Sequence, residues 1–143
     1  MSFKSAAAAA IFVIFAGSAA HAATLHFGAT LTGAEEVPAN TSTAKGEFSA
    51  ELETNEKVLV YRATFTGLSG PATMAHIHGP ADPGGNAPPV VAVKDPSSPI
   101  SGTAFLTDAQ IADLMAGKYY FNVHSAAHPG GEIRGQVKPL GSS

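Results

Sequence analysis

The sequence predicts an all-β domain, either an antiparallel β-sandwich or a flattened Greek-key barrel, with one short helix near residues 107–116. Three observations carry this prediction. Hydrophobic and polar residues alternate in several short stretches, turn residues separate these stretches, and Gly (15) and Pro (10) are frequent. Hydrophobic residues make up 45% of the chain and charged residues only 13%, a composition that excludes a highly charged disordered chain. A chain of 143 residues has room for one domain.

The alternation with a period of two predicts the strands in chain order. It is clearest in three stretches near the start of the domain, at 25–31, 48–52 and 59–65. Further strands are expected at 73–78, at 90–93, in a segment that ends at Phe105, at 119–123 and at 133–137. The segments 80–89 and 95–99 are rich in Pro, Gly and Ser, so they are expected to be loops.

The helix is predicted from its start and stop signals. Thr107 and Gln110 have the spacing of a capping box, in which each side chain bonds the backbone N–H of the other residue. An apolar stripe with helical spacing follows at Ile111, Leu114 and Met115. Gly117 then suits the left-handed position that ends many helices.

The first 22 residues have the features of a secretory signal peptide. Lys4 supplies the positive start, residues 6–16 are uncharged and largely apolar, and Ala20-His21-Ala22 gives a small-x-small cleavage pattern. The alternative is a membrane anchor, but this apolar stretch is shorter than the roughly 20 residues that span a bilayer. We therefore expect a signal peptide at 1–22 and a single domain at 23–143, with its core at about 24–138, that is secreted or periplasmic.

The charge and the absence of cysteine exclude several classes of partner and of site. The formal net charge is -3 and Lys and Arg do not cluster, so nucleic-acid binding is not expected. Membrane association is not expected after signal cleavage. The chain has no Cys, which excludes disulfides, thiolate metal sites and Cys nucleophiles.

Two groups of histidines carry the candidate chemistry. On the strand expected at 73–78, residues of one parity share a face, so Met74, His76 and His78 lie together. His124 is placed at the end of the strand that begins at 119, and His128 lies on the turn beyond it. If the two strand ends are neighbours, three or four imidazoles converge on one point.

Sites made only of imidazoles suit copper, with zinc as the alternative. His76, His78, His124 and His128 are the candidate metal ligands, and Met74 could add a thioether for Cu(I). The competing interpretation is that each His is a hydrogen-bonded surface or cleft residue.

Three charged residues are possible auxiliaries of this site: Glu36, Glu132 and Arg134. Glu132 and Arg134 share a strand face, and they could pair with each other or with the glutamates at 35 and 36. A surface or half-buried ion pair explains them better than catalysis. No complete catalytic set is present, so a binding protein is favoured over an enzyme.

Three motifs, in order along the chain, resemble those of the CHRD domain, the module named after chordin. Residues 31–38 (LTGAEEVP) resemble its opening motif, and residues 75–81 (AHIHGPA) its central motif. Residues 120–124 (YFNVH) and 129–136 (PGGEIRGQ) resemble its closing motif. The resemblance implies a β-sandwich-like extracellular domain and says little about activity.

A looser resemblance is to copper/zinc superoxide dismutase. His76, His78 and His124 match the local pattern of its copper ligands. The disulfide cysteines of that enzyme are absent here, and Glu132 stands near the place of its substrate-guiding Arg, where a negative charge would repel superoxide.

Three functions follow from the sequence. The first is metal capture or delivery by a secreted copper-binding domain, with affinity falling below about pH 6 because imidazole must be neutral to bind. The second is a superoxide dismutase-like copper oxidoreductase. The third is an extracellular module that binds another protein without a metal.

Overall fold

The computed structural model describes residues 22–142, so almost all of the expected signal peptide lies outside the described residues. The eight strands of this part of the chain are β1 (Thr24–Thr32), β2 (Lys45–Glu53), β3 (Val58–Thr66), β4 (Ala72–His78), β5 (Pro89–Ala92), β6 (Ile100–Phe105), β7 (Tyr119–Ser125) and β8 (Ile133–Ser142). A 3-10 turn, η1 (Gly33–Glu35), follows β1, and the helix α1 (Asp108–Met115) precedes β7.

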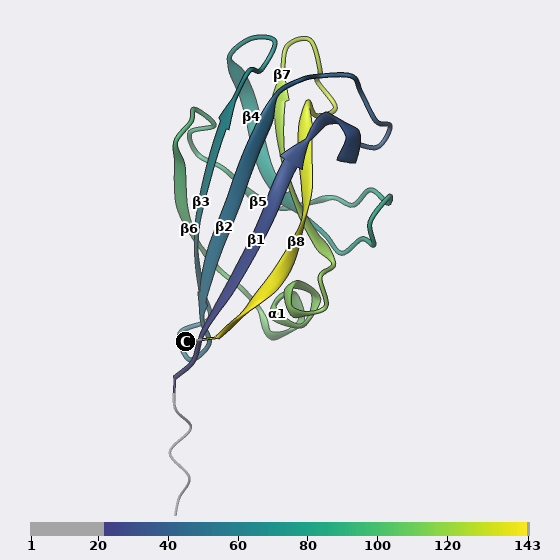
Figure 1. Ribbon diagram of the computed structural model, residues 1–143. Coiled ribbons are helices and arrows are strands. Elements are labelled where there is room, and N and C mark those ends of the chain that lie inside the picture. Colours follow the sequence, from purple (N-terminus) through teal and green to yellow (C-terminus); the bar gives the residue numbers. More distant parts are fainter. Residues whose placement is uncertain (1–21, 143) are drawn as a thin grey trace, which may run out of the picture.

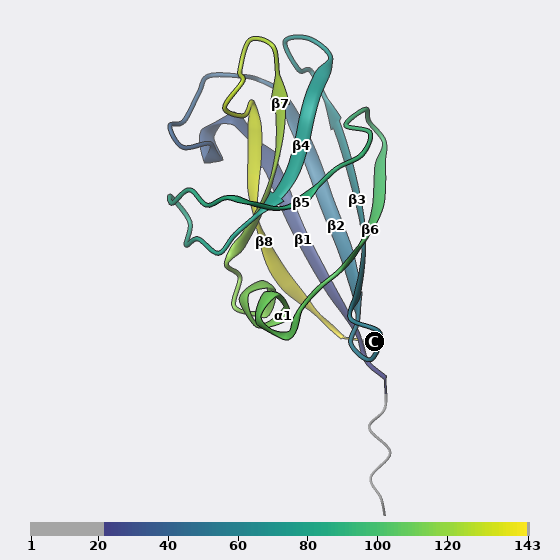
Figure 2. The ribbon, with the colours of Figure 1, turned by 180° about the vertical axis from the view of Figure 1, so that it is seen from behind.

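All eight strands form a single antiparallel sheet with the order β5-β4-β7-β8-β1-β2-β3-β6. The sheet curls on itself, so that β4, β5 and β7 lie behind β1, β2 and β3 (Figures 1 and 2). Within residues 22–142 this confirms the all-β class with a single short α-helix. The sheet is continuous and nearly closed, which matches the flattened barrel rather than two separate sheets.

The core fills the space between the two sides of the curled sheet. The alternation in β2 shows how the sequence builds this core. Every second residue from Gly46 to Leu52 is buried, and the residues between them are exposed. Phe48 on β2 stacks on Phe121 of β7, with 4.8 Å between ring centroids. This contact joins the two sides of the sheet across the core.

The predicted helix begins and ends as its sequence signals indicate. Thr107 Oγ1 accepts a hydrogen bond from the Gln110 N–H, and the Thr107 N–H donates to Gln110 Oε1. Leu114 is buried. Gly117, just beyond the helix, has φ +71, the left-handed conformation that residues with a side chain rarely adopt.

The strand β7 is buried on both of its faces. In many antiparallel sheets the polar face of a strand is exposed to solvent instead. Its polar face is covered by the loop of residues 79–88, between β4 and β5. Gln136 and Arg134 on β8 bind carbonyl oxygens of this loop at Ala81 and Gly85. The covered face of β7 carries the polar residues of the candidate site.

Candidate metal centre

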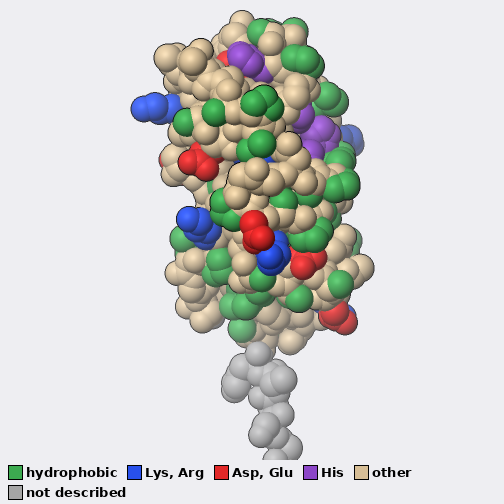
Figure 3. All heavy atoms as spheres, turned by 90° about the vertical axis from the view of Figure 1, so that its right-hand side faces the viewer, with side chains coloured by type: hydrophobic (Ala, Val, Ile, Leu, Met, Phe, Trp, Pro, Cys, Tyr) green, Lys and Arg blue, Asp and Glu red, His purple; other side chains and the backbone are tan. Residues whose placement is uncertain are grey.

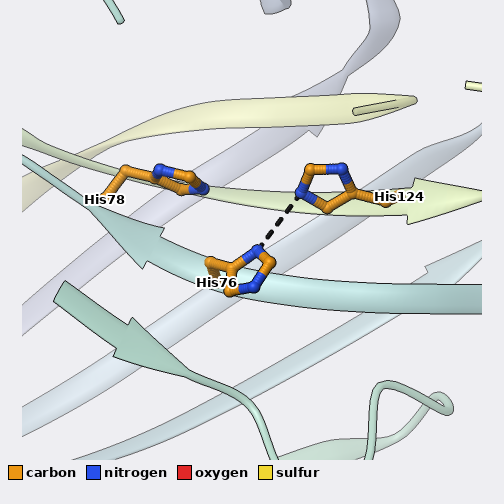
Figure 4. Close-up of side chains that lie close together, drawn as sticks. All are labelled: His76, His78 and His124. Carbon is orange, nitrogen blue, oxygen red and sulfur yellow. Dashed lines mark hydrogen bonds between the residues drawn. The ribbon is translucent and has the colours of Figure 1, made fainter. Parts of the chain in front are cut away.

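The pairing of β4 with β7 brings the two predicted histidine groups together. In the antiparallel register Met74 lies opposite His124, and His76 lies opposite Asn122. The ligand atoms of His76, His78 and His124 all lie within 4.8 Å of one another. Figure 4 shows the three rings turned toward a shared point, two from β4 and one from β7.

Two of the three imidazoles are held by backbone carbonyl groups. His78 Nδ1 lies 2.8 Å from the Ala87 oxygen, and His124 Nδ1 lies 2.8 Å from the Pro129 oxygen. A carbonyl oxygen only accepts, so each Nδ1 must carry the proton and donate it. In the neutral ring this leaves Nε2 with a free lone pair, the arrangement that second-shell partners of metal-bound histidines produce.

Both of these Nε2 atoms face the same amide oxygen. Asn122 Oδ1 lies 3.0 Å from His78 Nε2 and 3.1 Å from His124 Nε2. An amide oxygen also accepts only, so three acceptor atoms converge without a proton of their own. Such a convergence is satisfied by a proton donor, as His76 Nδ1 is toward His124 Nε2, or by a cation between the three atoms. Asn122 was not among the predicted site residues, although it shares a strand face with His124 two positions away.

His76 completes the group from the more exposed side. Its Nδ1 lies 3.2 Å from His124 Nε2, marked by the dashed line in Figure 4. Its ring stands edge-on to those of His78 and His124, with centroid distances of 5.3 and 5.1 Å. His76 and His78 are half-buried, while His124 is buried.

His78 is also fixed by a stack of side chains beneath it. Its ring lies parallel to that of Tyr120, with 4.7 Å between centroids, and the Arg134 guanidinium lies 3.4 Å from the centre of the Tyr120 ring. Arg134 donates to Asn86 Oδ1 at 2.9 Å, and the Tyr120 hydroxyl donates to the Ala87 oxygen at 3.1 Å. The loop that supplies the carbonyl for His78 is therefore tied to the stack that supports its ring.

The surroundings favour the neutral, metal-binding form of the rings. Burial lowers the pKa of His76 below its ordinary value of 6.5, and the nearby His124 and His78 lower it further. Burial is also the main cause that lowers the pKa of His78; hydrogen bonds with Ala87 and Asn122 oppose it, while His124 and Arg134 add to it. Both histidines thus resist protonation more than exposed histidines do.

The distances between the imidazole nitrogens are close to those between nitrogens that bind one metal ion. Two nitrogens that bind one Cu(II) or Zn(II) ion, each at about 2.0–2.1 Å, lie at most about 4.2 Å apart. The separations of up to 4.8 Å therefore need ring movements of less than about 1 Å. Three imidazoles would leave a fourth position for water, a substrate or a further ligand.

The other predicted site residues lie around this centre or away from it. Met74, opposite His124, is 47% exposed at the edge of the cluster. His128 is not a member of the three-histidine group; it is half-buried, and its backbone N–H and oxygen close the turn between β7 and β8. Neither has a contact that tests its predicted role as a ligand.

Glu36 and Arg134 are both buried and near each other. Glu36 is 5% exposed. Burial raises its pKa to about 7, although the Arg134 charge and hydrogen bonds with Asn122 and Val37 oppose the shift. Oxygen Oε1 of Glu36 has no hydrogen-bond partner among the described residues.

Glu132 is also buried, and its partners are hydroxyl groups rather than a cation. Its carboxylate accepts hydrogen bonds from the side chains of Ser42, Ser69 and Ser125, and from the Ser69 N–H. Burial alone would raise its pKa, but these hydrogen bonds lower it to about 2. Glu132 therefore joins the segments before β2, before β4 and at the end of β7, and it serves the fold rather than the histidine cluster.

The surface carries no large area of one charge on the face shown in Figure 3, where acidic and basic side chains are scattered and histidines reach the surface in separate places. Within residues 22–142, no helix has the length and apolar character that crossing a membrane requires.

Comparison with known proteins gives one match. The model of the CHRD domain family matches residues 27–137, which cover all three motifs and all three clustered histidines. No curated protein and no solved structure matches the chain. CHRD domains occur in extracellular proteins. The match extends over most of the sequence, and the chain therefore belongs to the CHRD domain family.

Proposed function

We propose that this domain binds copper through His76, His78 and His124 and acts in the capture or delivery of the metal outside the cytoplasm, as a secreted or periplasmic protein. The observation that carries the proposal is the contact of Nδ1 of His78 and of His124 with a backbone carbonyl oxygen, which places the proton of each neutral ring on Nδ1. It leaves two lone pairs and the Asn122 oxygen aimed at one point. Zinc is the alternative metal, since it accepts the same imidazole ligands.

A titration of the metal-free protein with Cu(II) tests this proposal. Wild-type protein is expected to bind one equivalent and to retain it through dialysis, and its EPR spectrum should show coupling to several nitrogens. The variant His76→Ala/His78→Ala removes two of the three imidazoles, so we expect at least a hundredfold weaker binding, on the order of the larger losses seen at metal sites.

Two single substitutions serve as controls for this titration. His26→Ala removes a histidine on β1, three strands away from β4 in the sheet, and should leave binding unchanged. His128→Ala asks whether the turn histidine adds a ligand. Equal Cu(II) binding by the wild type and the double variant would remove the site assignment, and a wild type that retains neither copper nor zinc would favour a module that binds another protein without metal.

A superoxide dismutase-like activity is the second candidate, supported by the three imidazoles and an open fourth position. Arg134 is the cation nearest to the site, but it is 2% exposed and contacts Asn86, Gly85 and Tyr120. A buried guanidinium is poorly placed to attract superoxide from solvent. We therefore expect copper-loaded protein to remove superoxide no faster than an equal concentration of free copper. A rate well above that of free copper would make the enzyme the better description.

A further inference from the structure

Glu36 is a buried acid that the ligand set above does not use. Its side chain is 5% exposed, and its Oε1 has no hydrogen-bond partner in the described part of the chain. Leaving a buried polar atom unpaired lowers the stability of the folded protein, so such an atom needs a physical reason.

The neighbour of Glu36 on the side of the histidines is the amide of Asn122. The two side chains are hydrogen-bonded, and both lie against Gly131, where an added Cβ would meet Glu36 Oε1 and Asn122 Nδ2. Gly131 has φ +125. A glycine here allows the backbone to come close enough for the acid and the amide to meet.

An amide has an oxygen on one side and an NH₂ group on the other. A carboxylate on one side accepts only, so it selects the NH₂ group of Asn122. The oxygen of Asn122 must then face the opposite way, toward Nε2 of His78 and His124, at the 3.0 and 3.1 Å given above. The orientation of the one amide that touches both imidazoles is therefore determined by Glu36.

The negative charge of Glu36 is only partly balanced. Arg134 is the nearby cation, but its guanidinium donates to Asn86 and to the Gly85 oxygen in the loop 79–88. Glu36 and Arg134 do not form a salt bridge within 4.0 Å among the residues that the structure describes. The Arg134 charge also lowers the pKa of His78, so the acid that faces Arg134 offsets part of a positive charge beside the centre.

We propose that Glu36 is a positioning residue for the metal centre: it holds the Asn122 oxygen against the imidazoles, and its negative charge offsets the positive charge of Arg134 beside a site for a dication. This inference rests on the proposed function and adds an acid–amide pair behind the three ligands. Neither Glu36 nor Asn122 needs to touch the metal ion. Their effect is to place an acceptor oxygen beside the imidazoles, and to offset the Arg134 charge, before the ion arrives.

The central test replaces Glu36 by the neutral residue of the same shape. In Glu36→Gln the negative charge is lost. The new side chain can offer either an oxygen or an NH₂ group to Asn122, so it no longer fixes the orientation of the Asn122 amide. We expect the Cu(II) dissociation constant to rise by about 10–100-fold, the usual effect of removing an outer-shell partner. Affinity for Cu(I) should fall less, because a singly charged ion gains less from the acid, so the copper reduction potential should rise.

The matched control is Glu35→Gln, which removes the same charge from the adjacent, exposed position. It should leave the dissociation constant and the potential unchanged. The double variant Glu36→Gln/Asn122→Asp exchanges the acid and the amide: the introduced amide can donate to the introduced carboxylate, whose second oxygen faces the imidazoles. It should restore Cu(II) affinity to within about tenfold of the wild type, which a merely structural role for Glu36 does not predict.

The outcomes separate the two proposals. A wild type that does not bind Cu(II) defeats the proposed function. Wild-type binding together with equal affinity and potential in Glu36→Gln overturns only the role of Glu36. A Glu36→Gln variant that loses binding, with no recovery in the double variant and with a matching loss of thermal stability of the metal-free protein, also overturns it, because the acid would then serve only the fold.

Discussion

Replacing Glu132 by Gln is expected to lower the free energy of unfolding by about 3 kcal/mol at pH 7. Glu132 is 1% exposed, and its carboxylate accepts hydrogen bonds from three serine hydroxyls and one backbone N–H. Together they lower its pKa from 4.5 to about 2, and a shift of this size corresponds to the stated free energy. The amide of Gln keeps one acceptor oxygen but turns an NH₂ group toward hydroxyls that now donate to a carboxylate.

The pH dependence of this difference follows from the direction of the shift. Because the folded pKa is lower than the unfolded one, the stabilisation is fully present above about pH 4.5 and is lost as the pH falls toward 2. Urea unfolding of wild type and Glu132→Gln at pH 7, 5 and 3 should show two curves that approach each other on the acid side. The exposed Glu56 gives the control, and Glu56→Gln should change stability by less than about 0.5 kcal/mol. An unchanged stability of Glu132→Gln at pH 7 would contradict the role given to the serines.

The local sequence signals were enough to predict most of the elements. Alternation in 48–52 and 59–65 predicts β2 and β3 because one face of each strand is buried and the other is exposed or half-buried. The capping box at Thr107 predicts the start of α1 for a reason that is local to four residues. The last strand runs to Ser142, beyond the predicted end at Val137, because pairing with β1 continues to Leu25. That pairing is a long-range contact, and the hydrophobic pattern does not report it.

The site was only partly predictable. The pattern His76-Ile77-His78 places two imidazoles on one face of a strand, and Ala75 and Ile77 are buried on the other face as expected. That β4 and β7 are neighbours is a property of the whole sheet, so the meeting with His124 could be stated only as a condition. The carbonyl groups of Ala87 and Pro129 left no signal at all, since every residue has one. Asn122 did leave a signal, because it shares the polar face of its strand with His124.

The charged residues show a different limit. An ion pair was expected for Glu132 or Arg134, but the acid binds serines and Arg134 binds the loop 79–88. Serines are frequent in loops, and three separate segments had to meet before they could surround one carboxylate. Spacing along the chain carries no information about such a meeting.

The largest functional effect is expected from low pH, which should lower the affinity for Cu(II) in two separate steps. Protons compete with the metal for each imidazole, and the pKa values of His76 and His78 lie below 6.5. These rings therefore remain neutral at pH values where exposed histidines begin to charge, and the main loss of Cu(II) affinity should fall below the pH of about 6 expected from the sequence alone. Once it begins, it should be steep, approaching about tenfold per pH unit for each imidazole displaced.

The smaller loss of Cu(II) affinity occurs at higher pH and results from protonation of Glu36. Its pKa is raised to about 7, so its negative charge is present above that pH and is lost as the pH falls through it. If the acid holds the Asn122 oxygen toward the metal, Cu(II) affinity should already weaken by about tenfold or more between pH 8 and 6. Competition titrations with a chelator of known affinity at pH 8, 7, 6 and 5 measure both steps.

Two variants separate the steps from each other. Glu36→Gln cannot titrate, so it should lack the step near pH 7 and keep the steep loss at lower pH. His78→Ala removes one competing proton, so its steep loss should be less steep by about tenfold per pH unit. A wild-type profile that falls in one step at about 6.5 or above would mean that the imidazoles titrate as free histidines do. The burial and mutual repulsion of the rings would then not control the affinity of the centre.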